Sequence, residues 1–155
     1  MYIVEKFYPA GFGPQDYWDD KYSREHIAGK GSGEYAKQGF WPVLEEQLKR
    51  DGHYLDAGCG IGGWILFLAD QGYRVEGMDS AARTVRALTE YNPDLQLKVG
   101  SLTALPYPDA QFDGVLAVGS LEYMERTVPQ SLRELARVTR RGPCIEAAAA
   151  RARSA

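Results

Sequence analysis

The sequence predicts an α/β fold with a doubly wound, mostly parallel sheet, and three observations support this prediction. From Tyr54 onward, short apolar runs alternate with stretches of helical periodicity. A glycine-rich turn at residues 58–63 joins the first apolar run to a helix. The intervals between the runs are long enough to hold crossover helices, which make neighbouring strands parallel and the crossovers right-handed.

The expected elements follow from this alternation. We expect strands at residues 54–57, 73–79, 95–100 and 114–118, and a short fifth at 144–148. A helix follows the glycine turn at residues 64–69, and residues 17–22 read as a leading helix. Residues 40–50 form an amphipathic pattern with Val43, Leu44 and Leu48 on its apolar face. Residues 29–33 predict a flexible loop.

Composition narrows the range of functions. The chain has 155 residues, a length that suits one domain, and its formal net charge of −3 provides no basic surface for nucleic acid. No stretch is long and apolar enough to span a membrane, and the N-terminus lacks the pattern of a secretory leader. Two cysteines do not indicate a disulfide framework, so we expect a cytoplasmic protein.

The glycine turn predicts a site for a nucleotide-like ligand, which could lie against backbone that carries no side chains. Two templates fit it. Gly58, Gly60 and Gly63, with Asp79 about 20 residues later, match the dinucleotide-binding fingerprint. Asp56, followed by glycine at positions 58, 60 and 62, matches the first motif of a different cofactor family. The turn alone leaves both open.

The motifs that follow favour the second template. The strand at 73–79 ends in a carboxylate, residues 105–113 read LPYPDAQFD, and residues 119–123 read GSLEY. In this order the series resembles the class I S-adenosylmethionine-dependent methyltransferases of small-molecule type (methyltransferase type 11-like), over residues 17–141. A nicotinamide dehydrogenase has no reason to carry LPYPDAQFD. The resemblance implies a Rossmann-like fold with the strands in the spatial order 3-2-1-4-5. It also implies methyl transfer to an N, O or C nucleophile of a small molecule, with S-adenosylhomocysteine as product.

The resemblance also implies which residues bind the cofactor at the first two strands. Asp79 would accept hydrogen bonds from both ribose hydroxyls, a charge-assisted contact worth roughly 1.5–3 kcal/mol. Met78 and Ser80 would flank the ribose and adenine, and Asp56 would lie near the methionine ammonium. The backbone of the turn would support the methionine and ribose portions, through Gly58, Cys59, Gly60 and Gly62.

Further contacts are implied around the rim of this site. Ser101 stands where the family usually has an aspartate that accepts from the adenine amino group, and Leu102 would form an apolar wall. Gly119 would lie near the transferring methyl group. Tyr17 and Tyr22 could stack over the sulfonium, whose charge favours an aromatic face, although a packing role is equally open.

No catalytic residue is identified from the sequence. Glu122 and Tyr123 replace the family's frequent Glu-His pair, which leaves them and His26 as candidates. Asp113 is expected to brace the fourth strand rather than to catalyse, and His53 is expected at the surface. No metal site is predicted.

The resemblance ends near the C-terminus. The domain is expected to consist of a cap with leading helices (1–50), a cofactor-binding core (51–147) and an Ala/Arg-rich tail (148–155). The family's last two strands have no sequence to form them, so the chain looks truncated after strand five. An uncovered sheet edge invites pairing, so we expect the protein to form a homodimer through this edge, to exchange segments, or to be only marginally stable. The alternative function is a non-catalytic S-adenosylmethionine-binding remnant, or a half-domain that needs a partner chain.

Overall fold

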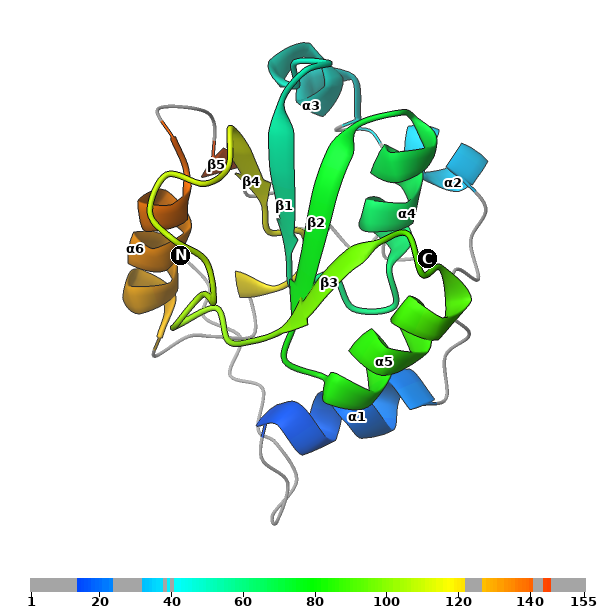
Figure 1. Ribbon diagram of the computed structural model, residues 1–155, viewed down its shortest axis with the longest axis vertical. Helices are drawn as coiled ribbons and strands as arrows, with labels where there is room; N and C mark the ends of the chain where they lie inside the picture. Colours follow the sequence, from blue (N-terminus) through cyan, green and yellow to red (C-terminus); the bar gives the residue numbers. More distant parts are fainter. Residues whose placement is uncertain are drawn as a thin grey trace, which may run out of the picture.

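The computed structural model describes residues 14–23, 32–37, 39, 41–121, 127–140 and 144–145. A parallel sheet lies between two layers that include helices (Figure 1). Its strands are β1 (His53–Ala57), β2 (Arg74–Asp79), β3 (Gln96–Val99), β4 (Gly114–Leu116) and β5 (Cys144–Ile145). The helices are α1 (Pro14–Ser23), α2 (Ser32–Ala36), α3 (Trp41–Gln47), α4 (Gly63–Asp70), α5 (Ala82–Tyr91) and α6 (Val128–Val138).

The order of the strands confirms the prediction. The sheet runs β3-β2-β1-β4-β5, and every adjacent pair is parallel. Central β1 is buried at all five positions, because it has a strand on each side and helices above and below. The carboxyl ends of β1, β2 and β4 therefore meet at one edge of the sheet, where ligands of doubly wound folds bind.

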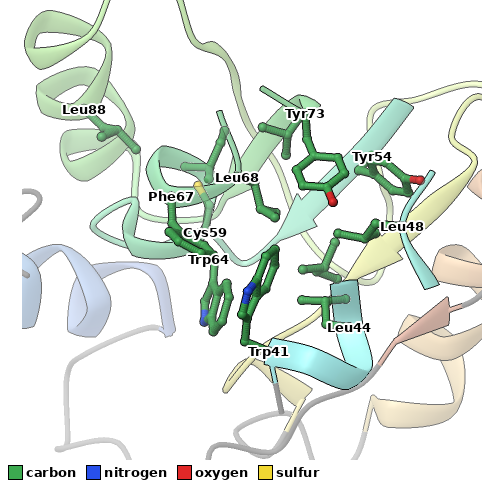
Figure 2. Close-up of a cluster of buried hydrophobic side chains, with 13 residues drawn as sticks. Trp41, Leu44, Leu48, Tyr54, Cys59, Trp64, Phe67, Leu68, Tyr73 and Leu88 are labelled. Carbon is green, nitrogen blue, oxygen red and sulfur yellow. The ribbon is translucent and has the colours of Figure 1, made fainter. Parts of the chain in front are cut away.

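Alternation along the strands divides the core in two. Tyr54 on β1 packs toward α3 and α4, whereas Leu55 and Ala57 face α6, because successive side chains of a strand point to opposite faces. Figure 2 shows the first core, in which Trp41 and Trp64 pack side by side near Leu44. The second core contains Phe112, Leu135 and Val138, which are fully buried.

α1 is attached to α5 through one buried carboxylate. The N-terminal residue before α5, Ala81, has no side chain that could cap the helix. Asp19 of α1 takes this role across space, since its Oδ1 accepts the Arg83 backbone N–H at 3.0 Å. The Asp19 side chain also lies 3.4 Å from Arg83 Nε. This contact holds α1 beside the first turn of α5, as the neighbouring blue and green helices in Figure 1 show.

The LPYPDAQFD segment is bound to α6 by a single guanidinium group. Arg137 donates to the carbonyls of Tyr107 (2.8 Å) and Leu105 (3.1 Å) and to Asp109 (2.8 Å). It also forms two hydrogen bonds with Glu134, whose Oε2 accepts the Leu105 N–H at 2.7 Å. The motif therefore has a structural basis, because these contacts set the path of a segment without regular secondary structure.

Several local expectations were wrong. Val43 is 64% exposed, and Trp41 takes its place on the buried face beside Leu44. His53 is buried, because it begins the central strand and its ring packs edge-on against Phe112 with centroids 4.9 Å apart. Residues 32 and 33, expected in a flexible loop, begin α2. Of the predicted strand at 144–148, the described part is Cys144–Ile145.

Replacing Arg137 with alanine is expected to destabilise the fold by about 1–3 kcal/mol, because two backbone carbonyls and Glu134 lose their partner. Urea unfolding followed by circular dichroism measures the change. Arg140→Ala is the matched control: this side chain is 54% exposed and contacts one carboxylate, Asp113, so its loss should cost about 0–1 kcal/mol. Equal losses for the two variants would contradict the role given to Arg137.

Candidate functional site

The glycine turn leaves β1 in a conformation that only glycine adopts without strain. Gly58, Gly60 and Gly62 have φ angles of 85°, 52° and 88°. The N–H groups of Gly58 and Cys59 both donate to the Met78 carbonyl, at 2.7 and 3.0 Å, which ties the turn to β2. A Cβ on Gly58 would lie 2.7 Å from the Ser120 Cβ. The turn thus passes close to β2 and to the corner after β4.

Asp79 ends β2 and is buried beside this turn. Its Oδ2 accepts the Gly60 N–H at 2.8 Å and its Oδ1 accepts the Ala81 N–H at 2.9 Å. Burial raises the pKa of this carboxyl group above its ordinary value, and the N–H groups of Ala81, Gly60 and Ser80 partly offset that rise. These three N–H groups use up to three of the roughly four acceptor sites of a carboxylate. Asp79 can still accept hydrogen bonds from a ligand.

Asp56 is a more deeply buried carboxyl group with an unsatisfied oxygen. The residue is 2% exposed, and its Oδ2 has no hydrogen-bond partner among the described residues. Burial, together with the negative charge of Asp79, raises the pKa of Asp56 to about 7. An unsatisfied buried acceptor next to a second carboxylate favours a ligand group that brings hydrogen-bond donors and positive charge.

Aromatic side chains of α1 lie over the turn. The rings of Trp18 and Tyr22 stack with centroids 5.3 Å apart, and Tyr17 meets Trp18 edge-on at 5.2 Å. The Tyr22 hydroxyl lies 2.8 Å from where a Cβ of Gly60 would be. The structure therefore brings Tyr22 to the glycine turn, whereas Tyr17 is linked to it through Trp18.

Tyr35 of α2 also lies at this turn, and sequence reasoning missed it. Its hydroxyl fills the space that a Cβ on Gly63 would need, and its ring meets Trp64 edge-on at 5.0 Å. Burial and the nearby Asp56 raise the pKa of its hydroxyl group. A lone tyrosine in a five-residue helix carries no sequence pattern that could have indicated this position.

Two of the predicted contacts are core side chains. Met78 is 1% exposed and belongs to the core on the α6 side, so its carbonyl, and not its side chain, contacts the turn. Cys59 belongs to the other core, where its thiol lies 3.2 Å from the position of a Cβ on Gly77. Ser80 follows Asp79 and is half-buried.

The remaining predicted contacts lie on loops at the same end of the sheet. Ser101 follows β3 and lies 2.8 Å, oxygen to oxygen, from the Thr103 hydroxyl, while Leu102 is buried. Gly119 has a φ of 67° and open space around it, and Ser120 donates to the Ala57 carbonyl at 3.2 Å. The three catalytic candidates, His26, Glu122 and Tyr123, lie outside the described residues.

Asp113 lies at the opposite end of β4 and has the bracing role expected of it. Its Oδ2 accepts the His53 N–H at 2.9 Å, and the Asp113 N–H donates to the His53 carbonyl at 2.7 Å. The His53 N–H and Arg140 hold the pKa of this carboxyl group below its ordinary value. Within the described ranges, no group of three metal-ligating side chains occurs, and no helix is long and apolar enough to cross a membrane.

Comparison with known proteins identifies the family. A sequence profile described as a methyltransferase domain matches residues 55–142, which include the end of β1, the glycine turn and α6. The chain belongs to the class I S-adenosylmethionine-dependent methyltransferases. Its sheet order and glycine turn, described above, agree with this family's Rossmann-like fold.

Individual relatives support the assignment. Demethylmenaquinone methyltransferase of Symbiobacterium thermophilum is 31% identical over 117 residues, which cover 68% of this chain and 46% of the relative. The O-methyltransferase resE of Aspergillus sclerotiorum is 31% identical over 144 residues, which cover 86% of this chain and 51% of the relative. The chain thus spans about half the length of these two curated relatives.

Solved structures give the same result for the fold. The PH0226 protein of Pyrococcus horikoshii superposes with a TM-score of 0.62 at 26% identity, over 77% of this chain and 61% of that one. The [4+2]-cyclase SpnF superposes with a TM-score of 0.56 at 26% identity, over 64% of this chain and 39% of SpnF. The second of these is named for a reaction other than methyl transfer.

The Asp56 carboxyl group of this methyltransferase domain should make the ligand-free protein less stable as pH rises from about 5 to 8. The folded state keeps the Asp56 proton up to a pKa of about 7, whereas the unfolded chain releases it near 4, so the folded state binds more protons in this window. Asp56→Asn removes this difference and should raise stability at pH 8 by an amount on the order of 1–3 kcal/mol. Thermal unfolding at pH 5 and 8 measures it.

The comparison with the unsubstituted protein isolates Asp56 from other titrating groups. Burial lowers the pKa of His53, so that group destabilises the fold at low pH and acts in the opposite direction, equally in both proteins. An Asp56→Asn protein no more stable than the parent at pH 8 would contradict the burial argument.

Proposed function

We propose that this domain binds S-adenosylmethionine at the carboxyl ends of β1, β2 and β4 and transfers its methyl group to an N, O or C nucleophile of a small molecule. The observation that supports this proposal is the pair of buried carboxyl groups at one glycine turn. Asp79 keeps acceptor capacity next to the Gly60 N–H, and Asp56 has a buried oxygen without a partner. These residues fit a ligand that carries both a ribose and an ammonium group.

In this proposal the two carboxylates bind the ends of one molecule. Asp79 accepts from two vicinal ribose hydroxyls, which match the spacing of its two oxygens. Asp56 accepts from the ammonium group, and that contact supplies the partner its Oδ2 lacks. Gly58 and Gly60 leave room for the ligand, because they have no side chain at the turn.

When bound, the cofactor would supply a methyl group on a sulfonium centre, from which a neutral thioether is a good leaving group. The protein then has to align the acceptor with that methyl group and to exclude water. The Tyr22 hydroxyl reaches the turn, while the Tyr22 ring stacks on Trp18 and the Lys21 ammonium lies over both rings, so the hydroxyl is the part of this aromatic pair that borders the site. His26, Glu122 and Tyr123 stay our candidates for contacting the acceptor, and such an enzyme can work without a fixed general base.

A small-molecule acceptor is supported by the relatives and by charge. Relatives that are 27–31% identical are named for demethylmenaquinone, ajmaline, norajmaline and sterol methylation. With resE included, the names of the relatives cover N-, C- and O-methyltransferases, so the acceptor atom differs among proteins of this similarity. The net charge of −3 gives no support to a nucleic-acid substrate.

The second candidate is an S-adenosylmethionine-binding domain that does not transfer methyl groups by itself. It is supported by the [4+2]-cyclase SpnF, a solved structure 26% identical to this chain that is named for a reaction other than methyl transfer. We further propose that such a domain pairs with a second copy through β5, which among the described residues has β4 as its strand neighbour. Light scattering at two protein concentrations tests this pairing.

S-adenosylhomocysteine should raise the melting temperature of the protein, and nicotinamide dinucleotides should not. A ligand at about 100 times its Kd adds roughly 2.7 kcal/mol of stability. Asp79→Ala should abolish most of this increase, because it removes both ribose contacts. Asp113→Asn is the control, since it should lower the melting temperature of the free protein and keep the increase on ligand addition. Stabilisation by the dinucleotide alone would overturn the proposed cofactor.

Methyl transfer separates the two candidates. The protein is incubated with S-adenosylmethionine carrying a labelled methyl group and with a panel of quinone precursors, alkaloids and sterols. It should transfer the label to at least one class of compound. Asp79→Ala should lower the rate of methyl transfer by at least about tenfold. Tight binding of S-adenosylhomocysteine without turnover on this panel would favour the binding domain over the enzyme.

A further inference from the structure

A cavity of about 310 Å³ lies at the amino ends of β1, β2 and β3. This is the opposite edge of the sheet from the proposed cofactor site, and the amino ends of β1 and β2 are their upper ends in Figure 1, away from α1. Sites for small molecules have volumes of roughly 300–1,000 Å³, so the cavity has room for a small ligand. The glycine turn contributes no residue to its lining.

One wall of the cavity carries two buried polar side chains that lack adequate partners. His53 and Glu76 are 7% and 8% exposed. His53 Nε2 lies 2.9 Å from Glu76 Oε1, but the two atoms are not aligned as a hydrogen bond, and Nε2 has no hydrogen-bond partner among the described residues. The same Glu76 oxygen accepts one long hydrogen bond, from Gln111 Nε2 at 3.4 Å. Polar groups buried in this way favour a ligand that supplies donors.

The His53 ring is an acceptor beside this carboxylate. Burial and the charge of Arg74 lower the pKa of His53, and Glu76 and Asp113 offset part of this fall, so the ring is neutral at pH 7. Because Nε2 forms no hydrogen bond with the carboxylate, the tautomer with its proton on Nδ1 fits, and this tautomer presents a lone pair at Nε2. The wall therefore offers two acceptors side by side, Nε2 of His53 and Oε1 of Glu76.

A guanidinium group matches these two acceptors. It is planar and carries N–H donors in a fixed fork, whereas an ammonium group is a compact charge whose donors diverge. Its positive charge also compensates the buried Glu76 carboxylate, which a neutral amide group would leave uncompensated. The wall of the cavity thus favours a ligand with a guanidinium group.

The rim of the cavity carries one further charge of each sign. Arg74, at the start of β2, and Asp94, shortly before β3, line the cavity and are exposed. Neither side chain forms an ion pair within the described part of the chain. Arg74 is therefore available to an anionic group of a ligand, and Asp94 to a second cationic group.

We propose that this cavity binds a small guanidino amino acid, with its guanidinium group at Glu76 and His53, its carboxylate at Arg74 and its ammonium group at Asp94. The inference is independent of the proposed function. Because the cavity lies at the edge of the sheet opposite to the cofactor site, the ligand is not a methyl acceptor there. A ligand that contacts the starts of β1, β2 and β3 stabilises the folded state relative to the unfolded chain.

Calorimetry with three ligands tests the site. L-arginine should bind with a Kd below about 1 mM. Citrulline has a neutral urea group in place of the guanidinium group and should bind at least about tenfold more weakly. Agmatine lacks the carboxylate and should bind at least about threefold more weakly than arginine. Lack of saturation by arginine up to about 10 mM, or a Kd for citrulline or agmatine equal to that for arginine, would overturn the proposal.

Three variants locate the bound ligand. Glu76→Gln keeps the shape of the side chain and should weaken arginine binding at least about tenfold, because the partner of the guanidinium group loses its charge. Glu45→Gln is the matched control: Glu45 is an exposed glutamate outside the cavity, and its loss should change the Kd by less than about twofold. Arg74→Gln should remove the preference for arginine over agmatine, because it removes the partner of the carboxylate.

Two results with these variants would refute the site. One is an equal effect of Glu76→Gln and Glu45→Gln on arginine binding, and the other is an unchanged preference for arginine over agmatine in Arg74→Gln. Arg74 is exposed at the start of its strand, so this variant keeps the test decisive if Glu76→Gln does not fold by circular dichroism.

S-adenosylhomocysteine separates this site from the proposed cofactor site. At saturation it should leave the Kd for arginine unchanged, because the two sites lie at opposite edges of the sheet. Competition between the two compounds would place arginine at the cofactor site and overturn this inference. Arginine binding by a protein that does not bind S-adenosylhomocysteine would support this site and overturn the proposed function.

Discussion

Two carboxyl groups buried at the carboxyl ends of neighbouring strands are the constraint on which the rest of this structure depends. Asp56 and Asp79 lie at the same glycine turn, and each raises the free energy of the ligand-free protein because its charged form loses water. Asp79 recovers part of that loss from the N–H groups of Gly60 and Ala81. One oxygen of Asp56 has no hydrogen-bond partner among the described residues. A binding site kept ready for a cationic ligand therefore reduces the stability of the free fold.

Charged side chains outside the site hold the elements around it in place. Asp19 attaches α1 to the first turn of α5, and so holds Tyr22 of α1 at the glycine turn. Arg137 and Glu134 attach the loop after β3 to α6. In both cases a charged side chain satisfies backbone groups that no strand or helix satisfies, and these hydrogen bonds are stronger than neutral ones. The loops of the site are thereby positioned by rigid helices.

Glycine has different functions at different places in this fold. At residues 58, 60 and 62 it permits positive φ angles in the turn. Gly77 in the middle of β2 serves packing instead, because a Cβ there would lie 2.7 Å from the side chains of Ile65 and Leu97. That close approach of α4 to the sheet keeps the first turn of α4 next to β2 and its terminal carboxylate.

The sequence by itself determined the parallel strands, the place of the glycine turn and the two carboxylates, because strand alternation, glycine and an acid that ends a strand each leave a local pattern. The order of the strands followed from the resemblance of the ordered motifs to a known family. It also gave Asp113 its bracing role, through the motif that contains it. Only the tertiary structure showed that Tyr35 lies at the turn, that His53 and Trp41 are buried, and that Asp19 and Arg137 hold the loops. These contacts join residues that are distant in sequence, and no local sequence pattern indicates which of them meet. Burial of a single side chain or the partner of a single guanidinium group depends on how the helices pack, and packing is settled only when the whole core forms.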